Sequence, residues 1–278
     1  MPQPGSTEER SLAHWAEQGR AGMEAFYALA AEDYRQMVAA RDWAADLRAH
    51  ARDGRVRVLD VACGSGKFPA ELQRQGLAAR VGDVRVEIDL LDPSAFSLAE
   101  ARSVLEAPFT VRAEHEVRIQ DLPADVGDVD VAWATHALYA VPPQEIGVGI
   151  ARMVAAQRPG GFGAIVHARS DSHYLRFAEA YRATFSPDAV PFTTAEQVRH
   201  ALTGAGVVPE VTTIRYDVGH PDRSVIEGFL QRCVFDDSVP LARMEIEGAV
   251  AEYLTPQLGT DGYRFTQLVD VITWEVPA

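Results

Sequence analysis

The stretch that decides the fold is Val56-Arg57-Val58-Leu59-Asp60-Val61-Ala62-Cys63-Gly64-Ser65-Gly66. Its apolar first half is typical of a strand that is buried on both faces, and its glycines allow the backbone to turn sharply and to approach a ligand closely. A helix is expected to begin near Lys67. A buried strand, a glycine turn and a helix in this order predict an α/β protein that holds a nucleotide cofactor at the turn.

Two common phosphate-binding turns do not fit this stretch. The dinucleotide pattern G-x-G-x-x-G needs a third glycine, where this chain has Pro69. The G-x-x-x-x-G-K-[ST] loop fails because Phe68 follows Lys67. Asp60 closes the strand, and its charge would repel a pyrophosphate but suits a cofactor with a cationic end.

The run from Asp60 to Gly66 reads D-x-x-x-G-x-G. It resembles the first motif of the Rossmann-like (class I) S-adenosylmethionine-dependent methyltransferases of the small-molecule type, and the likeness extends over about residues 54–170. The resemblance implies S-adenosylmethionine as the cofactor. It also implies that an acidic residue after the second strand binds the ribose and that an aspartate after the third meets the adenine amine. The cofactor-binding residues expected on these grounds are Asp60, Gly64, Gly66, Asp92 and Asp121.

Structural roles compete with these assignments for the three aspartates. Asp60 could cap the turn that follows it, and Asp92 precedes Pro93-Ser94, a common turn sequence. Asp121 lies in an ordinary Asp-Leu-Pro loop after a short expected strand, Glu116 to Ile119.

The order of elements predicts a seven-stranded, mainly parallel Rossmann-like sheet with helices on both faces. An N-terminal helical cap is expected over residues 1–50, and the Rossmann-like domain over 51–278 with a helical insertion at about 220–258. The remaining strands are expected at 86–92, 129–139 including its active-site end, 163–167, 211–218 and 267–274.

The N-terminal segment 11–50 reads as two helices rich in alanine and aromatic residues. Tyr27 and Tyr34 are seven residues apart, which places both on one face of a helix. The resemblance implies that such an extension covers the mouth of the cofactor site and contacts the substrate. The alternative is that these aromatic residues belong to the core.

Residues at the ends of the fourth and fifth strands are the candidates for chemistry. A sulfonium methyl group is already activated, so its transfer depends mostly on holding the nucleophile ~3 Å away and in line. An amine must also lose a proton, which a histidine can accept while a tyrosine holds the nitrogen. The predicted catalytic residues are His136 and Tyr139, and the predicted substrate-binding residues are Tyr27, Tyr34 and Tyr174. His136 could instead be a hydrogen-bonded core residue, and Tyr139 could pack against the cap.

The favoured function is methyl transfer to a small polar metabolite, with an amine nitrogen preferred because the acidic, aromatic-rich chain suits a cationic acceptor. The same cofactor allows a second reaction, in which its own amino group attacks its γ-carbon, releases methylthioadenosine and forms azetidine-2-carboxylate. A third hypothesis is a non-catalytic regulator that binds the cofactor.

Composition narrows the partners and the compartment. The net charge of −14 argues against nucleic acid, and the two cysteines, Cys63 and Cys233, exclude a disulfide framework and a cysteine-built zinc site, so no metal is expected. The start shows no secretory signal and no apolar run reaches ~18 residues, so we expect a cytoplasmic protein without a membrane partner. The excess of arginine over lysine indicates a bacterial source. The added helices would allow a homodimer.

Overall fold

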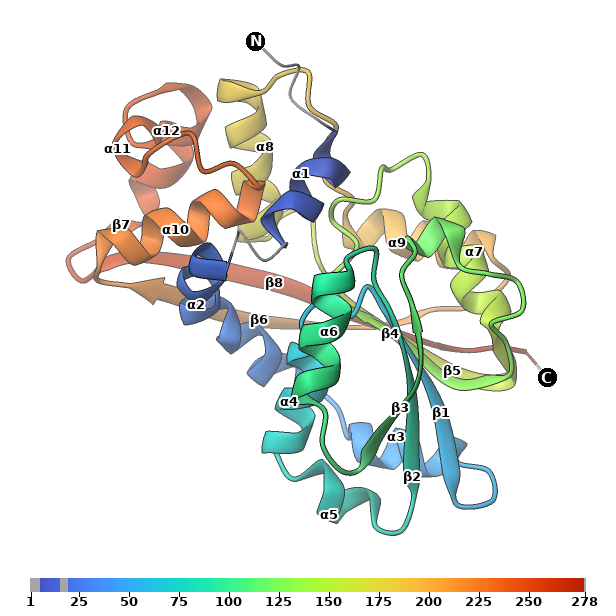
Figure 1. Ribbon diagram of the computed structural model, residues 1–278. Coiled ribbons are helices and arrows are strands. Elements are labelled where there is room, and N and C mark those ends of the chain that lie inside the picture. The colour runs from blue at the N-terminus through green and yellow to red at the C-terminus, as the bar shows by residue number, and fades with distance from the viewer. Residues whose placement is uncertain (1–5, 16–19, 278) are drawn as a thin grey trace.

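The computed structural model describes residues 6–15 and 20–277, and within them it forms one eight-stranded sheet with helices on both faces (Figure 1). The strands lie in the order β3-β2-β1-β4-β5-β8-β6, and the short β7 pairs with β8. Their bounds are β1 Arg55–Val61, β2 Arg85–Leu91, β3 Phe109–His115, β4 Val129–Thr135, β5 Gln157–Ala168, β6 Glu210–His220, β7 Leu258–Gly259 and β8 Gly262–Glu275.

The helices are placed along the chain as strand-to-strand crossovers and as additions before the first and last strands. They are α1 Thr7–His14, α2 Arg20–Ala39, α3 Trp43–His50, α4 Lys67–Arg74, α5 Leu77–Val81, α6 Ala95–Val104, α7 Ile146–Ala156, α8 His173–Phe185, α9 Ala195–Gly204, α10 Arg223–Val234, α11 Leu241–Met244 and α12 Gly248–Leu254.

The first five strands run parallel, and β8 and β6 are antiparallel to their neighbours. The expected mainly parallel Rossmann-like sheet is therefore confirmed. Because the strands are parallel, the carboxyl ends of β1, β2, β4 and β5 meet at one edge, where ligands bind in sheets of this kind. β1 and β4 are neighbours at the centre of this edge.

The core continues on both faces of the sheet, which explains the apolar central strands. Every residue of β4 but the last is buried. Trp43, Phe68 and Trp133 belong to one buried cluster, and Ile150 and Ile165 belong to another. Because Trp43 of α3 and Met37 of α2 lie in the same cluster as the sheet residues, the second half of the expected cap is part of the core.

The predicted position of the third strand was wrong. It spans Phe109–His115, while Ile119–Asp121 is a single 3₁₀ turn. β3 is an edge strand in which every second side chain is exposed, so its sequence alternates and lacks the apolar run typical of the inner strands.

Two further differences concern element boundaries. The N-terminal segment forms α1, α2 and α3 rather than two helices, and β5 begins at Gln157, so Arg158-Pro159-Gly160-Gly161 lies inside a strand with an irregular register. Thr194 and Gln197 form a capping box at the start of α9. The helical insertion is confirmed, as α10, α11 and α12.

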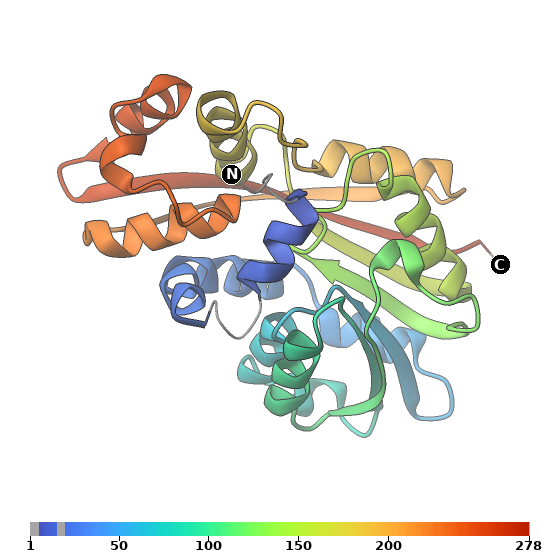
Figure 2. The same cartoon turned by 45° about the horizontal axis from the view of Figure 1, so that its top comes forward.

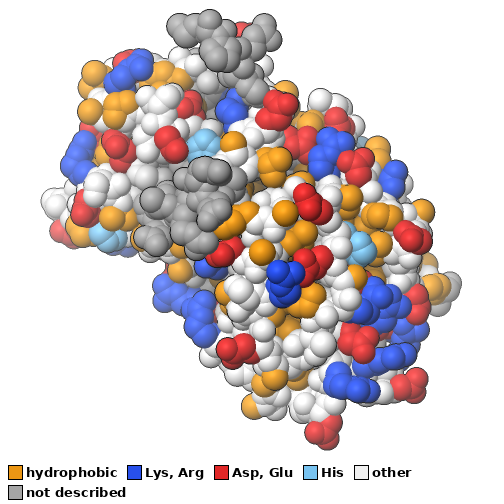
Figure 3. Space-filling view, viewed as in Figure 1, with side chains coloured by type: hydrophobic (Ala, Val, Ile, Leu, Met, Phe, Trp, Pro, Cys, Tyr) orange, Lys and Arg blue, Asp and Glu red, His pale blue; other side chains and the backbone are white. Residues whose placement is uncertain are grey.

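Charged side chains cover the amino-terminal ends of the strands. There the buried carboxylate of Asp130 accepts hydrogen bonds from Nε of Arg52 and Nε of Arg158, each at 2.7 Å. Figure 3 shows basic and acidic side chains mixed at the lower right, the end of the molecule where β1 begins. In the described part of the chain, none of the helices has the length and apolarity needed to cross a bilayer.

Candidate active site

A cavity of about 500 Å³ opens at the carboxyl ends of the parallel strands. Its walls come from the loops after β1, β2, β3 and β4 and from α1, α2, α8 and α10. In Figures 1 and 2, α1 lies across this edge of the sheet, between α10 and the β1–β4 half. The predicted residues that line the cavity are Tyr27, Tyr34, Gly64, Asp92, His136, Tyr139 and Tyr174.

The turn after β1 is built from left-handed backbone. Ala62 has φ +51°, Gly64 has φ +51° and Gly66 has φ +69°. A Cβ on Gly64 would meet no atom within 4 Å, and this glycine lines the cavity. A Cβ on Gly66 would lie 3.0 Å from Cα of Ala101 in α6, so Gly66 allows close packing of the turn rather than contact with a ligand.

Asp92, directly after β2, fixes this turn. Its Oδ2 accepts a hydrogen bond of 3.0 Å from the amide of Gly64, and its Oδ1 accepts one of 2.9 Å from the amide of Ser94. Burial raises the pKa of the Asp92 carboxyl to about 6, although these amides oppose the rise. A carboxylate beside an open glycine turn fits the ribose hydroxyls of an adenosine group, and it is the observation that makes the site suitable for S-adenosylmethionine.

Besides Gly66, two predicted cofactor residues do not line the cavity. Asp60 is 2% exposed within β1, beside Trp133 of β4, and does not line the cavity. Asp121 is on the surface, where its Oδ2 accepts a hydrogen bond of 2.7 Å from Arg118. The neighbouring Gln120 lines the cavity instead, with its Oε1 buried and without a hydrogen-bond partner among the described residues.

His136 and Tyr139 lie directly after β4 and contact each other. The backbone amide of Ala168 donates to the Tyr139 hydroxyl at 3.2 Å, and the hydroxyl is also hydrogen-bonded to Nδ1 of His136. If the Tyr139 hydroxyl donates its hydrogen bond to Nδ1, the ring proton of neutral His136 lies on Nε2. Nε2 is buried and has no hydrogen-bond partner in the part of the chain that is described. Burial lowers the pKa of His136 to about 3, and nearby His167 adds to this. His136 is therefore neutral near pH 7 and a weak proton acceptor.

A buried carboxylate lies opposite these residues. Asp33 of α2 is 2% exposed and lines the cavity, and its Oδ2 accepts a hydrogen bond of 2.5 Å from the hydroxyl of Tyr174. The Tyr174 ring is 5.7 Å from the His136 ring and 6.0 Å from the Tyr139 ring, measured between centroids. Burial raises the pKa of the Asp33 carboxyl to about 7, and the hydrogen bond from Tyr174 and the nearby hydroxyl of Tyr216 oppose the rise.

Helix α2 also closes the cavity over the glycine turn. The Tyr27 hydroxyl is 3.3 Å from Oγ of Ser65, and Nζ of Lys67 lies 4.6 Å from the centre of the Tyr27 ring. Tyr34 follows on the same face, with its ring centre 6.3 Å from that of Tyr27. Both tyrosines line the cavity.

Helix α1 bridges the two sides of the cavity. On one side Glu8 accepts hydrogen bonds from Arg118 at 3.3 Å and from Gln120 at 3.4 Å. On the other side Arg232 of α10 donates to the carbonyl of His14 and lies 5.2 Å from the centre of the Trp15 ring. These contacts hold α1 across the cavity.

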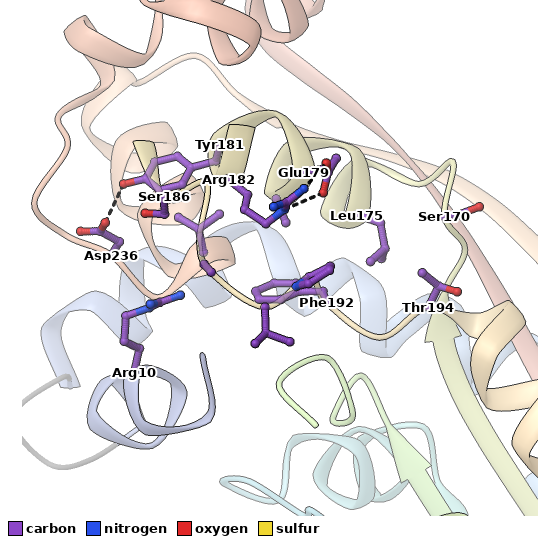
Figure 4. A pocket seen from close by; sticks show the side chains of 15 residues that line it. Arg10, Ser170, Leu175, Glu179, Tyr181, Arg182, Ser186, Phe192, Thr194 and Asp236 are labelled. Atoms are coloured by element: carbon purple, nitrogen blue, oxygen red, sulfur yellow. Dashed lines mark hydrogen bonds and ion pairs between the residues drawn. The ribbon is translucent and has the colours of Figure 1, made fainter. Parts of the chain in front are cut away.

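A second, smaller cavity of about 220 Å³ lies between α8 and the segment that precedes α9. Figure 4 shows two hydrogen-bonded pairs among its side chains: the Tyr181 hydroxyl donates to Asp236 at 2.8 Å, and Arg182 donates to Glu179 at 2.7 Å. Phe192 lines both cavities.

Sequence reasoning missed several residues that line the large cavity: Asp33, Lys67, Gln120 and Arg232. For Asp33 a signal was present, because an aspartate one position before Tyr34 interrupts the apolar face of a helix that carries Leu29 and Met37 inward. No such signal was present in the sequence for Arg232, since an arginine in an amphipathic helix ordinarily faces solvent.

Comparison with known proteins identifies a methyltransferase domain in part of the chain. Residues 58–161 match the family model of the methyltransferase domain. A search of curated proteins found no match.

Solved structures show the same fold at low sequence identity. A proposed methyltransferase from Bacillus halodurans is 14% identical, with a TM-score of 0.59 over 85% of this chain and 99% of that one. The YcgJ protein of Bacillus subtilis is 12% identical, with a TM-score of 0.56 over 84% and 96%. Magnesium protoporphyrin IX methyltransferase from Synechocystis, solved with bound S-adenosylhomocysteine, is 12% identical, with a TM-score of 0.55 over 96% and 99%.

The fold and the site thus define a Rossmann-like α/β protein with a nucleotide-cofactor turn. Together with the match of residues 58–161 to the methyltransferase domain, they support a class I S-adenosylmethionine-dependent methyltransferase, with S-adenosylmethionine as the cofactor.

Replacing Asp92 tests the cofactor end of the cavity. Asp92→Ala removes an acceptor for the ribose hydroxyls and the partner of the Gly64 amide, so S-adenosylhomocysteine should bind about 10- to 100-fold more weakly by calorimetry. Asp121→Ala is the matched control and should change the affinity less than about twofold, because Asp121 lies outside the cavity. Equal affinity of the Asp92 variant and the wild type would contradict the assignment.

The raised pKa of Asp33 predicts a pH-dependent stability. Unfolded aspartate has a pKa of ~3.9, and native Asp33 titrates at about 7, so between these values only the native state binds this proton. The free energy of unfolding therefore falls as pH rises through this window, by at most about 1.4 kcal/mol per pH unit.

Urea denaturation of the wild type and of Asp33→Asn at about pH 5, 6, 7 and 8 measures this effect. The variant should gain stability relative to the wild type as pH rises to about 7, and the difference should level off above that. Curves that stay parallel over the whole range would show that Asp33 titrates normally.

Proposed function

We propose that this methyltransferase transfers a methyl group from S-adenosylmethionine to an amine nitrogen of a small polar molecule. The supporting observation is the continuity of one cavity, which joins the glycine turn and Asp92 to an end lined by His136, Tyr139 and Tyr174. Its volume of about 500 Å³ lies within the range of small-molecule sites, and α1 covers its entrance.

The residues at the two ends of the cavity have separate tasks. Asp92 and the turn at Gly64 would hold the adenosine part, and S-adenosylmethionine supplies a methyl group activated by its positively charged sulfur. Tyr139, fixed by the Ala168 amide and by His136, would orient the acceptor nitrogen so that its lone pair points at the methyl carbon.

The cap would supply the rest of the acceptor site. Tyr27 and Tyr34 of α2, with Tyr174 of α8, present three aromatic faces to the cavity. Aromatic faces attract cationic groups, and this attraction grows when water is excluded. Such walls suit an amine that arrives as an ammonium ion better than they suit an anionic acceptor.

Mass spectrometry of the purified protein tests the proposal. Incubated with S-adenosylmethionine and a panel of small primary and secondary amines, the protein should form S-adenosylhomocysteine and a methylated amine. It should form neither with S-adenosylmethionine alone nor with the matching alcohols.

Three other outcomes would contradict the proposal in different ways. Methylthioadenosine formed without an acceptor would establish the intramolecular cyclisation to azetidine-2-carboxylate. Products from alcohols alone would move the acceptor from nitrogen to oxygen. Binding of S-adenosylhomocysteine without turnover of any acceptor would favour the non-catalytic regulator.

A further inference from the structure

Asp33 is a buried carboxylate without a cationic partner among the described residues. It is 2% exposed, and its Oδ1 has no hydrogen-bond partner there, although the residue lines the large cavity. No described lysine or arginine nitrogen lies within 4 Å of it, whereas the buried carboxylates of Asp89 and Asp130 are each paired with arginine. A carboxylate left in this state is costly unless a ligand supplies the positive charge or a proton neutralises it.

The surroundings of Asp33 suit a small organic cation. Phe26 and Tyr34 of α2 and Tyr139 and Tyr174 line the same cavity. The Phe26 ring stacks on Phe229 of α10 at 5.6 Å between centroids, which fixes one of these walls. Anionic oxygen and aromatic faces together are the chemistry that recognises an ammonium group.

From this arrangement we infer that Oδ1 of Asp33 binds the ammonium group of the acceptor and takes its proton before methyl transfer. The inference rests on the proposed function and assigns its proton acceptor. It gives the substrate class as a primary or secondary amine that carries an apolar group beside the nitrogen. Tyr174 is then a positioning residue, because its hydroxyl occupies Oδ2 and leaves Oδ1 for the ligand.

The proton balance of the step is simple. The ammonium group gives one proton to the Asp33 carboxylate, which leaves a neutral amine and a neutral carboxylic acid. The nitrogen lone pair forms the new N–C bond to the methyl carbon while the C–S bond breaks and its electron pair stays on sulfur. The product leaves as a methylated ammonium ion, and Asp33 returns its proton to solvent when the cavity opens.

Asp33 is better suited to this step than His136. A proton acceptor works best when its pKa is near the working pH. Burial raises the pKa of Asp33 to about 7 and lowers that of His136 to about 3, and Nδ1 of His136 is already hydrogen-bonded to Tyr139. His136 would instead orient Tyr139.

The titratable groups that face Asp33 carry no positive charge in the described part of the chain. They are Glu32 and Tyr34 on its own helix, Tyr139 after β4, Tyr174 on α8, Tyr216 on β6 and Cys233 on α10. Burial raises the pKa of each of these tyrosines and of the cysteine, so near neutral pH all five are uncharged. Asp33 is then the group in this set expected to exchange a proton with a bound amine.

Calorimetry on the protein saturated with S-adenosylhomocysteine tests the inference. The two ligands are benzylamine, which is cationic near neutral pH, and benzyl alcohol, which is neutral. Asp33→Asn should weaken benzylamine binding at about pH 8 by about tenfold or more and should change benzyl alcohol binding less than about twofold. At about pH 6 the wild type should release close to one proton per benzylamine bound, seen from titrations in buffers of different ionisation enthalpy, and the variant should release none.

Asp236→Asn is the matched control, because Asp236 also accepts a hydrogen bond from a tyrosine, Tyr181, but lines the smaller cavity (Figure 4). It should bind benzylamine as the wild type does. Equal benzylamine affinity in the wild type and Asp33→Asn, or equal proton release, would overturn the inference. So would a loss of S-adenosylhomocysteine affinity in Asp33→Asn, because Asp33 would then face the cofactor. A wild type that does not bind S-adenosylhomocysteine would instead contradict the proposed function.

Discussion

The hydrogen bond from the Gly64 amide to the Asp92 carboxylate joins the two loops on which the site depends. The loop after β1 can turn back only because three residues adopt left-handed backbone, and two of them are glycines. Asp92, at the end of the neighbouring strand β2, holds that turn open toward the cavity. The same carboxylate thus maintains the shape of the turn, and in the proposed function it also binds the ribose of the cofactor.

Gly64 and Asp92, which line one end of the cavity, could be placed there from the sequence. The apolar strand, the glycines and Asp92 are local features, and they depend only on backbone geometry and on the order of strands in a parallel sheet. Local patterns failed where the surroundings decide exposure. Asp121 and Gln120 are neighbours in one 3₁₀ turn, and only the packing of that turn determines which of them faces the cavity.

The acceptor end was only partly predictable. Tyr27 and Tyr34 could be placed on one helix face by their spacing, and Asp33 lies on the inward face between Leu29 and Met37, but nothing in the sequence places it opposite Tyr174 in the cavity. That position follows from contacts across long separations, since Asp33 meets Tyr174 of α8, 141 residues later. The edge strand β3 was missed for a related reason, because its alternating side chains match no buried run. Pairings of this kind arise from the tertiary fold.

The central claim is that a single cavity holds the cofactor at Asp92 and presents its reactive sulfur to the end that contains Asp33 and Tyr139. A crystal structure of the protein with S-adenosylhomocysteine tests this most directly. The account predicts ribose hydroxyls hydrogen-bonded to the Asp92 carboxylate, with the sulfur facing the space between Asp33 and Tyr139. A ribose bound away from Asp92, or a sulfur directed toward solvent, would contradict it.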